Sequence, residues 1–225
     1  QGANRVCEKP AEKAVEQGGR HGMTTSGQPC NAPTRRLVEA SRDDAAVTEA
    51  TEVAASIKVG PTTEAGRHMG PVVNKTQWEK IQGMIQVGID EGARMTTGGT
   101  GLPENVNRGF YVKPTIFADV TNDMRVAQEE IFGPVLVMIP FKDEADAIRI
   151  ANDTPYGLTN YVQSTDGPKR NRMARALKAG MIEMNHQSRG DGAPFGGIKL
   201  SGLAREGGVW GIEEYLVSKS IPGWD

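Results

Sequence analysis

The chain has 225 residues and a formal net charge of −2, with 37% hydrophobic and 24% charged residues. This composition supports a hydrophobic core and is not that of a disordered chain. Acidic and basic residues are mixed without a basic stripe, which argues against nucleic-acid binding. No apolar run reaches about 18 residues and no secretory signal is visible, so we expect no contact with a membrane. Two cysteines make neither a disulfide framework nor a zinc site, so we expect no metal and a reducing, cytoplasmic setting.

Apolar residues recur at spacings of three and four in several segments, which predicts helices. The predicted helices cover residues 11–20, 43–58, 75–91, 143–151 and 166–179, and a short helix running into a strand covers 209–219. Asp43 and Asn74 are placed to cap two of these helices. Gly92 and Gly180 are placed to end two of them.

Short apolar or alternating segments lie between these helices and predict strands. They cover residues 36–38, 94–97, 111–117, 135–141, 158–163 and 181–184, and Cys7 lies in a further strand-like segment. The segment 135–141 is almost wholly apolar, as expected for a strand buried on both faces. Strands and helices alternate, and no linker divides the chain. We therefore predict a single α/β unit over residues 1–225, with a mainly parallel sheet covered by helices.

Cys30 is the first candidate for chemistry and lies in the stretch SGQPCNAPTR. Its neighbours are polar or turn-forming, whereas a packed cysteine usually has apolar neighbours. A reactive thiol also needs a base or a lowered pKa, and donors for the developing oxyanion. None of the three scattered histidines is an identifiable partner from the sequence. The local context therefore leaves both a reactive and a structural role open for Cys30, while Cys7 is interpreted as structural.

Two further motifs have both a functional and a structural interpretation. EEIFGPV, residues 129–135, is either a ligand-facing acidic turn or a solvated turn with Phe132 plugged into the core. PFGGIKLSG, residues 194–202, is either a backbone approach to a ligand or an ordinary tight loop. GGTG at 98–101 does not match G-x-G-x-x-G, and no Walker motif occurs, so the sequence carries no dinucleotide fingerprint.

The motifs SGQPC, EEIFGPV, NDTPYGL (152–158) and PFGGIKLSGLAREGG follow one another in a fixed order. Together they resemble the aldehyde dehydrogenase superfamily, and the resemblance runs from about Gly2 to Trp224. It implies oxidation of a small-molecule aldehyde to an acid with NAD or NADP. In that family the cysteine forms a thiohemiacetal, hydride passes to the cofactor, and water cleaves the thioester that remains.

The resemblance also implies roles for individual residues. Cys30 corresponds to the nucleophile, and its backbone N–H to part of the oxyanion hole. Glu130 corresponds to the glutamate that binds the nicotinamide ribose, and Phe132 would pack near the same part of the cofactor. Gln77 and Lys80 resemble a family segment that reaches the other ribose.

The sequence departs from the family pattern in several places. Family chains are roughly twice as long, and their N-terminal dinucleotide-binding domain, general-base glutamate and oxyanion-hole asparagine have no counterpart in these residues. Val209 replaces a common glutamate and Ala204 a common glycine. We therefore expect the catalytic, cysteine-bearing portion of an aldehyde dehydrogenase. It would act as a homo-oligomer or with a partner that supplies the missing domain.

Two alternatives to a complete dehydrogenase remain open. The chain could keep only the acylation half of the chemistry and act as a weak cysteine esterase. It could also be a remnant that uses the fold for binding or oligomerisation. The sequence does not identify the aldehyde or decide between NAD and NADP.

Overall fold

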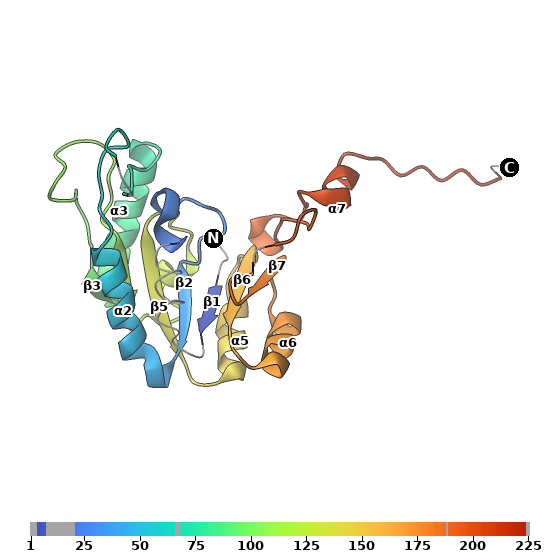
Figure 1. Cartoon of the computed structure of the whole chain (residues 1–225), viewed down its shortest axis with the longest axis horizontal. Coiled ribbons are helices and arrows are strands. Elements are labelled where there is room, and N and C mark those ends of the chain that lie inside the picture. Colours follow the sequence, from blue (N-terminus) through green and yellow to red (C-terminus); the bar gives the residue numbers. More distant parts are fainter. Residues whose placement is uncertain (1–3, 8–20, 66–67, 188, 224–225) are drawn as a thin grey trace.

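A seven-stranded sheet organises the computed structural model, which describes residues 4–7, 21–65, 68–187 and 189–223 (Figure 1). The strands are β1 (Asn4–Cys7), β2 (Arg35–Glu39), β3 (Arg94–Thr97), β4 (Thr115–Ala118), β5 (Val135–Phe141), β6 (Thr159–Gln163) and β7 (Met181–Met184). Their spatial order is β3-β4-β5-β2-β1-β6-β7. Only β3 and β4 pair antiparallel, and every other neighbouring pair is parallel. The predicted α/β fold with a mainly parallel sheet is confirmed.

Helices lie on both faces of the sheet. The α-helices are α2 (Asp43–Ala55), α3 (Lys75–Asp90), α4 (Arg125–Gln128), α5 (Glu144–Asn152), α6 (Gly167–Ala176) and α7 (Gly208–Glu213). The described residues also form the 3₁₀ turns η1 (Thr24–Gly27), η2 (Ala40–Arg42) and η3 (Lys199–Ser201). None of the helices within the described ranges is long and apolar enough to cross a membrane.

Strand β5 shows why the sheet needs a helical layer on each side. Val135, Val137 and Ile139 belong to a core shared with α3, α5 and α6, whereas Leu136 and Met138 belong to a second core under α2. Side chains alternate between the faces of a strand, so a strand covered on both sides is apolar throughout. The continuous apolar run in this segment is therefore explained by the place of β5 inside the sheet, with helices on both faces.

Two predicted caps have different outcomes. Asn74 Oδ1 accepts a hydrogen bond from Gln77 N at 2.9 Å, and Gly92 adopts a φ of +84° just beyond α3. Asp43, in contrast, is not a cap: it is the first residue of α2, Arg42 occupies the cap position, and the Asp43 carboxyl is buried. Burial and the neighbouring carboxylates raise the pKa of Asp43.

The helical segment at 166–179 also ends earlier than predicted. Asp166 caps α6 through Lys169 N, but the helix stops at Ala176. Gly180 serves instead as a close-contact position, since a Cβ there would lie 2.0 Å from the Gly196 carbonyl oxygen. The predicted helix over 11–20 and the side chain of Cys7 lie outside the described residues.

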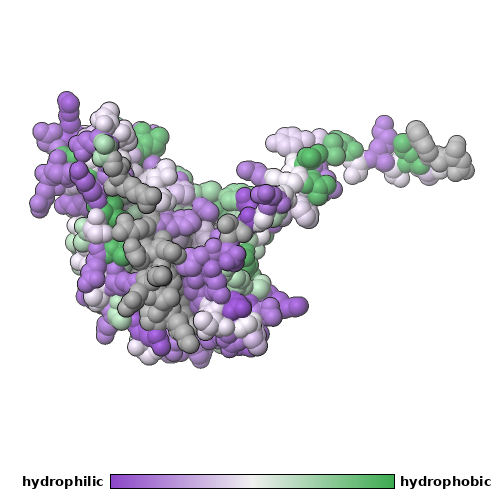
Figure 2. All heavy atoms as spheres, viewed as in Figure 1, coloured by the Kyte–Doolittle hydropathy of each residue, from purple (hydrophilic) through white to green (hydrophobic). Residues whose placement is uncertain are grey.

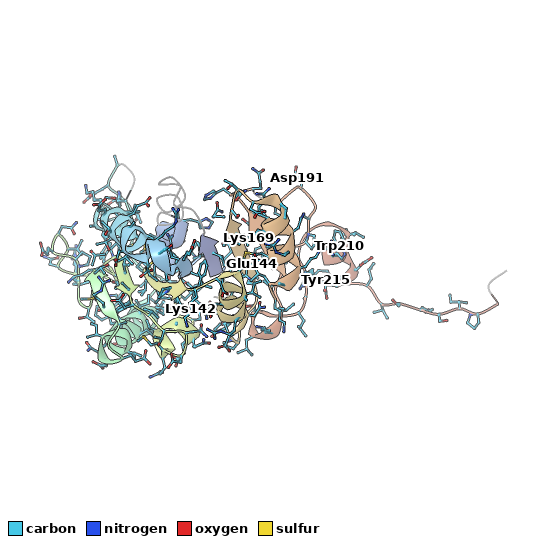
Figure 3. All side chains as sticks on the ribbon, turned by 90° about the horizontal axis from the view of Figure 1, so that it is seen from below. Lys142, Glu144, Lys169, Asp191, Trp210 and Tyr215 are labelled. Carbon is cyan, nitrogen blue, oxygen red and sulfur yellow. The ribbon has the colours of Figure 1, made fainter. Side chains whose placement is uncertain are left out.

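The C-terminal arm, residues 208–223, extends away from the sheet (Figure 1). Its first part is α7, but the predicted strand after this helix is wrong, because residues 214–223 form no ladder with any described strand. Figure 3 shows Trp210 and Tyr215 on this arm. Glu144 on α5 and Lys169 on α6 instead lie on the helices that cover the sheet. Glu144 and Arg172 form an ion pair of 2.7 Å that joins α5 to α6.

Candidate active site

Several of the motif loops meet at the edge where the parallel strands begin, here called the amino edge. The segment containing Cys30 leads into β2, the EEIFGPV segment into β5, and residues 152–158 into β6. Ligands of parallel α/β sheets usually lie at the opposite edge, beyond the carboxyl ends of the strands. The sheet register therefore brings together motifs that are far apart in the sequence, on the less usual side of the sheet.

The loop before Cys30 has an unusual backbone. Thr25, Ser26 and Gly27 have φ values of 50°, 59° and 71°, a region that residues with a Cβ rarely adopt. Ser26 is buried, and its hydroxyl donates to the Gly70 carbonyl at 2.8 Å. Such strained backbone persists only where surrounding contacts impose it, and it occurs often at functional sites.

Gly27 brings the nucleophile loop against the EEIFGPV segment. A Cβ at Gly27 would lie 2.1 Å from the carbonyl carbon and oxygen of Gly133 and 2.4 Å from Pro134 N. No other residue type fits at that separation. The glycine of the SGQPC motif is thus explained by the contact between two of the predicted motifs.

Cys30 itself lies on a turn between η1 and β2 and is a free, exposed thiol. The Tyr161 hydroxyl of β6 donates to the Asn31 carbonyl at 2.9 Å and anchors the turn to the sheet. Within the described ranges, the backbone N–H of Cys30 makes no hydrogen bond. This N–H and the exposed thiol are the two groups that an acyl-transfer site requires at its nucleophile.

Glu129 and Glu130 have different surroundings. Arg125 Nε donates to Glu129 at 2.6 Å, and this ion pair lowers the pKa of Glu129, with a smaller contribution from Lys80. Glu130 is half-buried at the beginning of the turn into β5. Lys80 is exposed on α3.

Phe132 has a φ of 56°, so its backbone is also in the left-handed region. Its side chain is half-buried, whereas the side chain of the neighbouring Ile131 is buried. Gln77 donates from Nε2 to the carbonyls of Ile131 and Phe132, at 3.0 and 2.8 Å. Gln77 therefore contacts the turn that carries Glu130 and Phe132.

The PFGGIKLSG loop packs on residues 152–158 at the same edge. Lys199 Nζ donates to the carbonyls of Asn152 and Thr154 at 2.8 and 2.9 Å, and Gly157 N donates to Ser201 Oγ at 3.1 Å. Burial, followed by the neighbouring cations, lowers the pKa of Lys199. A Cβ at Gly196 would lie 2.4 Å from the Ala204 carbonyl oxygen, so this glycine permits close packing of the chain on itself.

Arg35 is a residue that sequence reasoning missed. Its guanidinium is buried at the start of β2 and donates to the carbonyls of Ala127 and Ile150 and to Asn122 Oδ1, at 2.7–3.1 Å. Burial lowers its pKa to about 10, against a smaller raising effect of Asp153. The sequence signal that could have identified Arg35 is its place as a charged residue directly before the predicted strand at 36–38.

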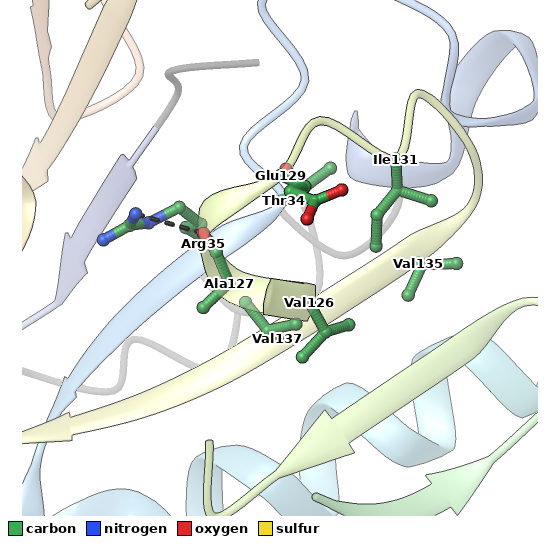
Figure 4. A pocket seen from close by; sticks show the side chains of 8 residues that line it. All are labelled: Thr34, Arg35, Val126, Ala127, Glu129, Ile131, Val135 and Val137. Carbon is green, nitrogen blue, oxygen red and sulfur yellow. Dashed lines mark hydrogen bonds between the residues drawn. The ribbon is translucent and has the colours of Figure 1, made fainter. Parts of the chain in front are cut away.

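A cavity of about 10 Å³ lies beside the Arg35 side chain (Figure 4). Its lining comes from the start of β2, from α4, from the turn between α4 and β5, and from β5 itself. It comprises Thr34, Arg35, Val126, Ala127, Glu129, Ile131, Val135 and Val137. This space is enough for about one water molecule. It is a packing defect next to the site and is too small for a substrate.

No cluster of three or more metal-ligating side chains occurs in the part of the chain that the structure describes. His68 Nε2 contacts the Pro61 carbonyl at 2.5 Å, and the His21 ring packs edge-on against Tyr161. The arrangement at the amino edge is therefore a thiol with an available backbone donor, beside a turn that presents a carboxylate and an aromatic ring.

Comparison with known proteins assigns the family. Residues 6–221 match the aldehyde dehydrogenase family. A putative aldehyde dehydrogenase of Staphylococcus saprophyticus is 46% identical over 199 residues, which are 88% of this chain and 42% of that relative. The chain thus spans less than half the length of this curated relative.

Solved structures agree with this assignment. The crystal structure of aldehyde dehydrogenase from Bartonella henselae superposes with a TM-score of 0.93 at 52% identity, covering 97% of this chain and 46% of that one. A mutant of aldehyde dehydrogenase C from Pseudomonas syringae, in complex with NAD⁺ and octanal, gives 0.93 at 40% identity, covering 97% and 45%. The Mycobacterium tuberculosis aldehyde dehydrogenase with NAD⁺ gives 0.90 at 40% identity, covering 95% and 44%. The chain belongs to the aldehyde dehydrogenase family.

Proposed function

We propose that this chain supplies the nucleophile and the nicotinamide-ribose contacts of an NAD(P)-dependent aldehyde dehydrogenase. The observation that carries the proposal is the contact between Gly27 and Gly133, which joins the Cys30 loop to the Glu130 turn. Family membership and the NAD⁺ complexes of two similar structures support it. The octanal complex supports an aldehyde as the substrate class.

Cys30 would act as the nucleophile. Its thiolate attacks the aldehyde carbon, a C–S bond forms, and the carbonyl oxygen becomes an oxyanion. The backbone N–H of Cys30, which has no acceptor within the described ranges, would donate to that oxygen. Loss of hydride from the thiohemiacetal carbon leaves a thioester on Cys30, and water then cleaves it to the acid.

The residues near Cys30 fit one part of the cofactor. A carboxylate such as that of Glu130 accepts hydrogen bonds from ribose hydroxyls, and the half-buried Phe132 ring offers an apolar face beside it. Lys80 is exposed on the same side, where it lowers the pKa of Glu129. The sequence holds no glycine-rich phosphate loop, so the fit concerns the ribose end. The cofactor, when bound, accepts the hydride, and this chain's residues orient it.

The acylation half of the chemistry is testable on the 225-residue chain alone. We expect p-nitrophenyl acetate to acetylate Cys30 with release of nitrophenolate, as detected by absorbance and by mass spectrometry of the Cys30 peptide. Cys30→Ser should abolish the adduct, whereas Cys7→Ser should keep it. Equal ester cleavage by the wild type and Cys30→Ser would refute a nucleophilic role.

The redox half requires a cofactor held against the thiohemiacetal. We expect the chain alone to form the acyl-enzyme from the ester but to reduce NAD⁺ negligibly with a simple aldehyde. Absorbance of the reduced cofactor checks this. Fast NAD⁺ reduction would contradict this expectation and would mean that the chain holds the whole site.

The C-terminal arm supports association with a second copy. Tyr215 and Val217 are 90% and 94% exposed, and apolar side chains are visible along the arm (Figure 2). Contiguous exposed apolar surface of this kind usually marks an interaction site. We expect light scattering to show a dimer or larger assembly, and Val217→Asp to weaken it. A strict monomer at micromolar concentration would contradict this.

A further inference from the structure

We propose that Gln77 is a positioning residue that couples the Cys30 loop to the Glu130 turn through the beginning of α3. The inference rests on the proposed function for its catalytic meaning. Its structural basis is a set of three segments that contact one another in pairs: the nucleophile loop (24–30), the α3 entry (70–77) and the Glu130 turn (130–134). Two of the three contacts are made by hydrogen bonds, and the third by close packing of backbone atoms.

The α3 entry holds the Glu130 turn through Gln77. Both hydrogen bonds of the Gln77 Nε2 group go to consecutive carbonyls, those of Ile131 and Phe132. These carbonyls flank the residue whose backbone is left-handed, so the amide stabilises a conformation that Phe132 would otherwise adopt at a cost. Gln77 is itself fixed, because Asn74 caps its backbone N–H.

The same entry segment holds the nucleophile loop. Val73 N donates to Gln28 Oε1 at 3.1 Å, and Gln28 Nε2 donates to the Thr25 carbonyl at 3.1 Å. Ser26 Oγ donates to the Gly70 carbonyl at 2.8 Å. Gln28 and Gln77 therefore have parallel roles. The carboxamide of Gln28 joins the α3 entry to the nucleophile loop, and that of Gln77 joins it to the Glu130 turn.

The third contact closes the set. Gly27 lies against Gly133 without room for a Cβ. Because all three segments contact one another, a shift of the Glu130 turn is transmitted to the residues that precede Cys30. The backbone N–H of Cys30 would be affected by such a shift, since oxyanion stabilisation depends on the direction of the donor.

This assignment differs from the role that the family resemblance implies for Gln77. A side-chain amide has two N–H donors and one carbonyl acceptor, and the donors of Gln77 are committed to Ile131 and Phe132. Only Oε1 remains for a ribose hydroxyl. The donor function of Gln77 is therefore directed at the protein and not at the cofactor.

A pair of substitutions separates donor chemistry from size. Gln77→Glu keeps the shape of the side chain but replaces the donors with a carboxylate facing two carbonyls. Gln77→Lys changes the shape but keeps a donor, and Lys199 in this molecule already donates from Nζ to two backbone carbonyls. Gln86→Glu is the matched control, because Gln86 lies exposed on the same helix and donates from Nε2 to Asp90 Oδ1 at 2.8 Å, away from both loops.

Hydrogen exchange of the 225-residue chain gives the first measurement. In Gln77→Glu we expect exchange about tenfold faster in segments 24–30 and 130–134, since two hydrogen bonds are lost. Exchange in the sheet strands should not change. Gln77→Lys and Gln86→Glu should behave as the wild type. Faster exchange in 130–134 alone, or in neither segment, would overturn the coupling.

The second measurement compares two reactions at Cys30. Acetylation by p-nitrophenyl acetate passes through an oxyanion, whereas alkylation by iodoacetamide does not. We expect the ratio of acetylation to alkylation to fall about tenfold in Gln77→Glu and to stay unchanged in Gln77→Lys and Gln86→Glu. A purely structural role for Gln77 would leave this ratio constant.

Two further outcomes are informative. If Gln77→Glu does not fold, Gln77→Met, which has similar length and no donor, takes its place, and unchanged exchange in Gln77→Met would overturn the proposal. If the wild type is not acetylated at Cys30, the proposed function fails. Hydrogen exchange still tests the coupling in that case, so the two failures are distinguishable.

Discussion

Gly27 and Gly133 lie in backbone contact, with space for no side-chain atom between them: a Cβ on Gly27 would stand 2.1 Å from the Gly133 carbonyl. The two glycines belong to motifs far apart in the chain, yet their loops form one surface at the amino edge of the sheet. The contact explains the glycine at position 27, whereas a Cβ at Gly133 would meet the Ile81 side chain at 2.5 Å. The contact also makes the geometry around Cys30 dependent on the turn that carries Glu130.

Gly27→Ala should therefore destabilise the protein by about 2–4 kcal/mol, because the new methyl group overlaps backbone atoms that cannot move independently. Gly92→Ala is the matched control. Gly92 also has a positive φ, but nothing lies within 4 Å of the point that its Cβ would occupy. Its cost should be only the backbone term of about 1 kcal/mol. Urea denaturation measures both values, and equal costs would contradict the contact.

Glu130→Gln should weaken NAD⁺ binding about tenfold, because a carboxylate accepts hydrogen bonds from ribose hydroxyls more strongly than an amide does. Glu129→Gln should have little effect on binding, since the Glu129 carboxylate is already engaged by Arg125. Isothermal titration calorimetry with NAD⁺ distinguishes them. A larger loss of NAD⁺ affinity in Glu129→Gln than in Glu130→Gln would mean that Glu129, and not Glu130, contacts the ribose.

Arg35→Met should lower the free energy of unfolding by about 3 kcal/mol, because the carbonyls of Ala127 and Ile150 lose a charged donor while remaining buried. Arg175→Met, on the exposed side of α6, should change it by about 0.5 kcal/mol or less. Thermal unfolding of the two variants provides the comparison. Similar melting temperatures would show that the hydrogen bonds of Arg35 contribute little net stability.

Glu183→Gln should stabilise the chain at neutral pH and not in acid. Burial raises the pKa of Glu183, more strongly than Arg189 lowers it. Between the ordinary glutamate pKa and this raised value, the folded state binds the proton and the unfolded state does not, so stability falls as pH rises through that interval. The gain in Glu183→Gln should be about 0.5 kcal/mol or less, because the side chain is only half-buried. Melting temperatures at about pH 4 and pH 7.5 test it, and a gain in acid would contradict the sign.

Much of the fold follows from local patterns in the sequence. The strand at Val135–Phe141 and the helix beginning after Asn74 are formed as predicted, because an apolar run and a capped amphipathic stripe are strong signals. The segment predicted as a strand over 111–117 forms one only at Thr115–Ala118, since the residues before it have no partner in the ladder. The boundaries of a strand depend on which strands pair with it, and local sequence patterns do not reveal that pairing.

The site could be predicted in part for the same reason. Cys30, Glu130 and Phe132 are recognisable because their motifs are local. Whether each binds or catalyses as the resemblance implies stays a prediction, as do the roles of Gln77 and Lys80. The bonds of Gln77 to Ile131 and Phe132 were not predictable, because they join residues more than fifty positions apart. The buried Arg35 was missed because polar residues beside strands are usually exposed.

The position of β1 has a consequence for how the chain acquires its structure. Asn4–Cys7 is the first described strand in the sequence, yet it lies between β2 and β6 and pairs with both. During synthesis β1 can find β2 early, but its other edge has no partner until Gln163 has been made. The half of the sheet formed by β6 and β7 therefore joins the rest through a long-range closure of high entropic cost. Folding of this chain should be slow at that step, and the unpaired side of β1 is where a nascent chain would be most exposed to wrong strand pairing.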